Sequence, residues 1–87
     1  MSWHRVIITN PAMAQTASDR LLQQWRAIYQ AAGRPAEAGV FREPNTADMV
    51  WYFSPTASIL ATDILWVFGA TVCPQPPNLG ALEKVES

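Results

Sequence analysis

The sequence predicts an α+β domain in which a four-stranded antiparallel sheet carries two helices on one face. Its patterned segments follow the order strand, helix, strand, strand, helix, strand, and all precede a proline-rich stretch near the C-terminus. Two right-handed strand-helix-strand units joined by a hairpin close most simply into the sheet order 4-1-3-2, with strands numbered along the chain. We therefore expect a single domain over residues 1–75.

The first strand is expected at Trp3–Thr9, a run rich in β-branched side chains. It stops at Asn10-Pro11, because proline cannot donate to a sheet ladder and restricts the residue before it. From about Gln15 apolar residues recur at three and four residues and form one stripe of a helix, which Gly33 is suited to end. The stripe consists of Ala17, Leu21, Trp25, Ile28, Tyr29 and Ala32.

An antiparallel hairpin is expected next. A short strand candidate at Val40–Glu43 is followed by the turn sequence Pro44-Asn45-Thr46 and then by Met49–Phe53, a run of apolar and aromatic residues with high strand propensity. These runs supply the second and third strands.

The second helix is expected to start at Ser54-Pro55 and to end at Gly69. Serine caps free amide groups, and proline is preorganised for the first helical position. Ala70–Cys73 is the last expected strand. Residues 76–87 are interpreted as a proline-rich hinge and tail, which can form a helical turn or two, be disordered or dock on a partner.

This βαββαβ order resembles the ferredoxin-like fold. Many unrelated functions share that architecture, so the resemblance implies a fold and no activity.

The alternation of side chains along strands predicts which residues face the helices. Val6 and Ile8 form the cleanest apolar pair of the first strand, so we place them under the helices. Phe41, Met49, Trp51, Phe53 and Val72 are placed with them, whereas the open face is expected to carry Trp3, Arg5, Ile7, Val40, Arg42, Val50, Tyr52, Thr71 and Cys73. A slip of one residue in the third strand would exchange Trp51 for Tyr52 on the open face.

The composition favours a partner for the open face. The chain has only 87 residues, of which 49% are hydrophobic, including four tryptophans, and 15% are charged. A domain of this size buries only about 60% of the surface of its unfolded chain. We therefore expect a homodimer that forms through the open sheet face.

Several other classes of function are disfavoured. A net charge of −1 gives no basic surface for nucleic acid. The longest apolar stretch, Ile59 to Val72, is interrupted by Thr62 and Asp63 and is shorter than the roughly 20 residues of a membrane span. One cysteine and no signal-peptide pattern favour the cytoplasm. One histidine and one cysteine cannot complete a zinc site, and no cofactor motif occurs, so neither metal nor cofactor is expected.

The candidate ligand-binding residues are Trp3, Arg5, Arg42 and Tyr52, all expected on the open face. The arginines would hold a carboxylate or phosphate, and the aromatic rings would stack on an apolar or planar part of an anionic small molecule. The same side chains also occur on sheet faces for packing alone.

No catalytic residue is expected. His4 and Cys73 come to the same end of the sheet, but the alternation directs them to opposite faces. The sequence therefore favours a non-catalytic homodimeric interaction module or a small-ligand-binding regulatory module. The alternative is a small enzyme with a cleft on the open face or at the dimer interface, which would use Cys73 or Tyr52 on an anionic substrate.

Overall fold

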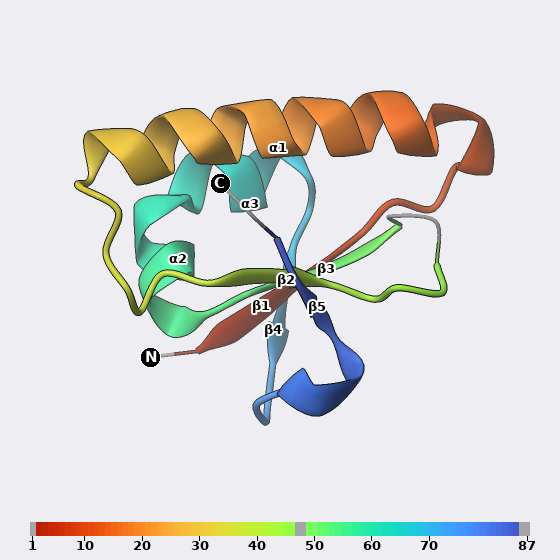
Figure 1. Cartoon of the computed structure of the whole chain (residues 1–87). Coiled ribbons are helices and arrows are strands. Elements are labelled where there is room, and N and C mark those ends of the chain that lie inside the picture. Colours follow the sequence, from red (N-terminus) through yellow and green to blue (C-terminus); the bar gives the residue numbers. More distant parts are fainter. Residues whose placement is uncertain (1, 47–48, 86–87) are drawn as a thin grey trace.

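One antiparallel sheet and a layer of helices on one of its faces build the protein (Figure 1). The computed structural model describes residues 2–46 and 49–85. Its strands are β1 (Trp3–Ile7), β2 (Val40–Arg42), β3 (Val50–Phe53), β4 (Thr71–Cys73) and β5 (Glu83–Lys84). Its α-helices are α1 (Ala14–Ala31), α2 (Pro55–Leu60) and α3 (Thr62–Val67), and two 3-10 turns are η1 (Pro11–Met13) and η2 (Leu79–Ala81). The predicted α+β class is confirmed.

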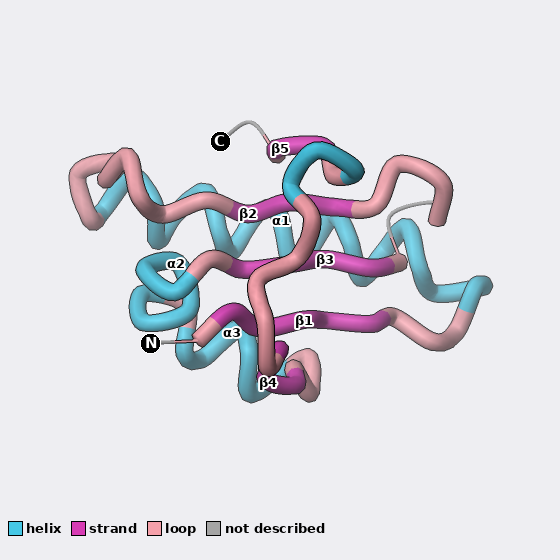
Figure 2. Tube along the Cα trace, turned by 90° about the horizontal axis from the view of Figure 1, so that it is seen from below, coloured by secondary structure: helices cyan, strands magenta, loops and turns pink. Residues whose placement is uncertain are grey.

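The sheet has five strands, in the order β4-β1-β3-β2-β5, and the predicted four-stranded sheet is therefore not matched exactly. The additional strand, β5, pairs with the outer edge of β2. Figure 2 shows how the chain reaches it: after β4 the segment of residues 74–82, here named the strap, crosses the sheet on the face opposite the helices. The tail thus lies against the sheet as far as residue 85, and its residues 86 and 87 lie outside the described part of the chain.

The core lies between the sheet and α1. Trp51 and Phe53 of β3 and Val6 of β1 are fully buried on the helix side, as their alternation predicts. Trp25 of α1 meets Phe53 edge to face, with ring centroids 5.9 Å apart. Buried Leu21 lies one helical turn before Trp25 on the same stripe, so the predicted apolar stripe of α1 is the one that covers the sheet.

The predicted faces of β2 are wrong. Val40 pairs with Phe53 and is only 1% exposed, so it lies under the helices, while Phe41 pairs with Tyr52 on the open face. A strand of three residues with apolar side chains on both faces has no clear period, and the hairpin register decides its orientation. Gly39 permits the result, because a Cβ there would come within 2.8 Å of the Phe41 ring.

Val72 was predicted to be covered by the helices, and it is on their side of the sheet but is not buried. Its register opposite His4 places it on the helix side, yet its side chain is 59% exposed because β4 is the sheet edge.

The second predicted helix is divided at Ala61 into α2 and α3. The Thr62 hydroxyl donates to the Ile59 carbonyl at 3.0 Å, a local bond that competes with regular helix geometry. Gly69 ends α3 with a φ of +64°, and the Ala70 amide donates back to the Leu65 carbonyl at 2.9 Å. No helix among residues 2–46 and 49–85 is long and apolar enough to cross a membrane.

Ser54 connects β3, α2 and the loop before β2. Its buried hydroxyl oxygen accepts the Ala57 amide at 3.3 Å as the N-cap of α2, and it also accepts the Gly39 amide at 2.9 Å. The same hydroxyl donates to the Glu37 carbonyl at 3.0 Å. One side chain therefore ties the loop before β2 to the end of β3, where the two strands begin to pair.

We predict that Ser54→Ala lowers the free energy of unfolding by about 2–3 kcal/mol, because it removes a helix cap and leaves the buried Gly39 amide without its side-chain acceptor. Urea denaturation measures the change. Ser2→Ala is the matched control at an exposed serine and should differ from wild type by less than about 0.5 kcal/mol. Equal stability of the two variants would contradict the role given to Ser54.

Candidate functional site

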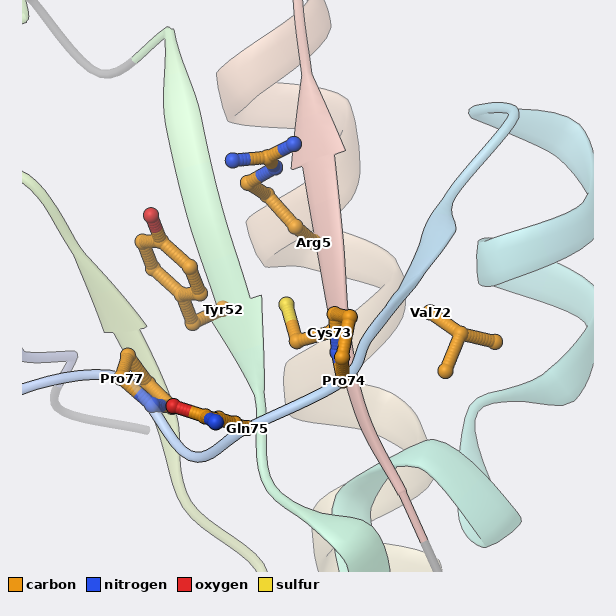
Figure 3. A pocket seen from close by; sticks show the side chains of 7 residues that line it. All are labelled: Arg5, Tyr52, Val72, Cys73, Pro74, Gln75 and Pro77. Carbon is orange, nitrogen blue, oxygen red and sulfur yellow. The ribbon is translucent and has the colours of Figure 1, made fainter.

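An open pocket lies on the sheet face opposite the helices, beside the strap (Figure 3). Its volume of about 490 Å³ lies within the range of small-molecule sites. It is lined by Arg5, Tyr52, Val72, Cys73, Pro74, Gln75 and Pro77. Three of these residues belong to the strap, so the pocket exists only while the strap lies across the sheet.

Strand pairing brings the polar lining residues together. Arg5 of β1 is the direct register partner of Tyr52 of β3, so both side chains project from the open face. Cys73 projects from the same face of β4, where it pairs with Trp3. Figure 3 shows the side chains of Arg5, Tyr52 and Cys73 on one side of the sheet, with that of Val72 directed away from them.

Burial and a hydrogen bond to Glu43 keep the Tyr52 phenol protonated. The Tyr52 hydroxyl donates to Oε1 of Glu43 at 3.2 Å. Burial is the main cause that raises the pKa of Tyr52; Glu43 raises this pKa further, while Arg5 acts in the opposite direction. The phenol is therefore neutral at physiological pH, and Arg5 is the charged group among the described lining residues.

The strap is held at its far end by β5. Arg42 forms an ion pair with Glu83 at 3.2 Å, and the Val85 amide donates to the Val40 carbonyl at 2.9 Å. The Val85 side chain packs against the core. These contacts lie on the other edge of the sheet from β4, where the strap begins, so the strap is anchored at both ends.

Two of the four predicted ligand-binding residues, Arg5 and Tyr52, line the pocket. Trp3 lies on the open face as predicted, and its ring packs on Phe41 with centroids 5.8 Å apart. Arg42 was expected on the open face, and this placement is wrong. Its register partner is Trp51, and its guanidinium lies 6.0 Å from the centre of that buried ring on the helix side. The inverted faces of β2 account for the error.

The strap residues of the pocket, Pro74, Gln75 and Pro77, were missed by the sequence analysis. The proline run signals an extended segment but gives no direction for it. Its course back over the sheet depends on β5, a pairing of only two residues that has no periodic signal of its own.

The pocket holds no nucleophile with a neighbouring histidine. His4 pairs with Val72 and Phe53 on the helix side, whereas Cys73 lies on the open face, which confirms the prediction that they point apart. The Nδ1 atom of His4 is buried and has no hydrogen-bond partner among the described residues. In the same part of the chain, no cluster of three or more His, Cys, Asp or Glu side chains could hold a metal ion.

We predict that Val85→Asp removes the strap wall of the pocket and exposes the partly buried Cys73 beside it, because a carboxylate placed against the core opposes the docking of β5 and loosens the strap. Cys73 should then react at least about threefold faster with an aromatic disulfide reagent. Val67→Asp, the same change at a valine that is 64% exposed on α3, should leave the rate unchanged. An unaltered rate in Val85→Asp would contradict the shielding of Cys73 by the strap.

We also predict that Tyr52→Phe flattens the loss of stability at alkaline pH. The pKa of Tyr52 in the folded protein lies above its ordinary value of 10.0, so the unfolded chain releases this proton first. The stability that the protonated Tyr52 contributes to the folded state is complete below the ordinary pKa, and it is lost as the pH rises through the pKa of the folded protein. Urea denaturation between about pH 8.5 and 11 checks this, and equal slopes for wild type and variant would contradict it.

Comparison with protein-family models, with curated proteins and with solved structures gave no match for this chain.

Proposed function

We propose that the protein is a non-catalytic module that binds an anionic small molecule in the pocket between the open sheet face and the strap. One observation carries the proposal: the guanidinium-bearing side chain of Arg5 lines a pocket of about 490 Å³ whose described lining contains no Asp, Glu, Lys or second Arg. An arginine in such surroundings is suited to a carboxylate or phosphate oxygen, because charge-assisted hydrogen bonds strengthen where water is displaced.

The walls of the pocket support a ligand with an apolar part. The rings of Pro74 and Pro77 and the aromatic ring of Tyr52 offer rigid apolar surface, while the Gln75 side chain can donate or accept a hydrogen bond. A single arginine favours a ligand with one anionic group over a di- or triphosphate, whose charges would need several cations.

A binding role is better supported than catalysis. The alternative, a small enzyme for an anionic substrate, rests on the thiol of Cys73 in the same pocket as Arg5. Nucleophilic catalysis by a thiol needs a base within hydrogen-bond reach, and the histidine of this chain lies on the other face of the sheet. The pKa of Tyr52 is shifted upward, away from the range useful to a general base.

Three expectations from the sequence remain proposals. A ferredoxin-like core extended by β5 is supported by the order β4-β1-β3-β2 within the sheet. A cytoplasmic location rests on the sequence pattern alone. A homodimer through the open sheet face is supported by Ile7, an apolar residue of that face that remains 44% exposed. Light scattering over a dilution series tests the dimer.

We predict that Arg5→Gln weakens binding of small carboxylates by about tenfold or more, because a hydrogen bond to a charged group is worth about 1.5–3 kcal/mol. Amide chemical-shift changes on titration of the labelled protein with acetate, benzoate and inorganic phosphate provide the affinities. Arg26→Gln, on the exposed surface of α1, is the matched control and should bind as wild type does. Equal affinities of wild type and Arg5→Gln would refute the proposed anchor.

A further inference from the structure

We infer that the pocket selects a zwitterion of the amino-acid class, whose carboxylate contacts Arg5 and whose ammonium group contacts the hydroxyl oxygen of Tyr52. The inference deepens the proposed function and rests on it.

A tyrosine hydroxyl has one proton to donate and two lone pairs that accept. The proton of Tyr52 is directed to Oε1 of Glu43, 3.2 Å away. Tyr52 therefore presents only lone pairs to the pocket and repels an anion at this point. Arg5, its register partner on β1, is a cation beside the phenol and acts to lower the pKa of Tyr52.

Glu43 enforces this direction of the hydroxyl. If Tyr52 turned its proton toward a ligand, the half-buried carboxylate of Glu43 would lose this donor and would face the phenol oxygen instead. The negative charge of Glu43 behind the phenol also favours a cation in front of it. Glu43 is thus a specificity-determining residue although it does not line the pocket.

The two charged groups of the ligand are consequently placed side by side. Arg5 and Tyr52 are directly opposite each other on neighbouring strands, a spacing of about 5 Å between Cβ atoms. An α-amino acid carries its carboxylate and ammonium groups on one carbon and can reach both. A volume of about 490 Å³ leaves room for an apolar side chain against Pro74 and Pro77.

The test compares matched ligand pairs on the full chain by titration monitored through amide chemical shifts. The pairs are alanine and propionate, leucine and 4-methylpentanoate, and phenylalanine and 3-phenylpropionate, with phenethylamine as the amine alone. We expect at least one amino acid to bind about tenfold tighter than its carboxylate partner and than the amine. Equal binding of acid and amino acid in every pair would overturn the zwitterion inference and leave the anion site standing. No binding of any carboxylate, amino acid or inorganic phosphate would overturn the proposed function as well.

Variants of Tyr52 and Glu43 separate the contributions of these two residues to the preference for an amino acid over its carboxylate partner. Tyr52→Phe removes the accepting oxygen and should abolish the preference for the amino acid, while Arg5 keeps the affinity for the carboxylate partner. Glu43→Gln retains an acceptor for the Tyr52 hydroxyl without the charge and should reduce the preference to about threefold. Glu37→Gln is the control, since this side chain is exposed and lies outside the pocket. An undiminished preference in Tyr52→Phe would overturn the inference.

Discussion

The alternation of side chains along β3 is the constraint on which the other features of the structure depend. Trp51 and Phe53 are fully buried beneath the helices, and this burial compels Tyr52 between them to project from the opposite face. A slip of one residue would expose both large rings to the open side and place a phenol in the core, at a cost of several kcal/mol. The register of β3 with its two neighbours then brings Arg5 beside Tyr52 and lays Arg42 over Trp51.

The strap both stabilises the sheet and forms part of the pocket wall. A small domain has a limited core, and this chain uses its C-terminal segment to cover part of the open face and to add β5 at the sheet edge. Because Pro74, Gln75 and Pro77 are walls of the pocket, docking of the strap and formation of the pocket are one event. A ligand that binds only the docked state stabilises that state, with a free energy set by its concentration relative to its Kd.

The chemistry of the pocket comes from three neighbouring residues, Arg5 on β1, Tyr52 on β3 and Glu43 directly after β2. Arg5 supplies positive charge, and the Tyr52 hydroxyl donates its proton to Glu43, which leaves the lone pairs of the phenol oxygen as acceptors. Burial raises the pKa of the phenol, so its neutral form persists. In the binding role that we propose, such an arrangement would discriminate between ligands through the position of donors and acceptors.

Local patterns in the sequence were sufficient for the elements whose signals lie within a few residues. The stripe of α1, the Ser54-Pro55 start of α2, the glycine ends at Gly33 and Gly69, and the inward faces of Trp51 and Phe53 all correspond to the structure. The same alternation placed Arg5 and Tyr52 together. Only the tertiary structure decided the faces of β2, and with them the position of Arg42. Val40 and Phe41 are both apolar and point to opposite faces, so a strand of three residues contains no clear period, and its pairing with β3 decides which face is buried. The tertiary structure also decided the course of the strap. The two residues of β5 pair with β2, more than 40 residues earlier in the chain, so the contacts that stabilise β5 cannot be found in its local sequence.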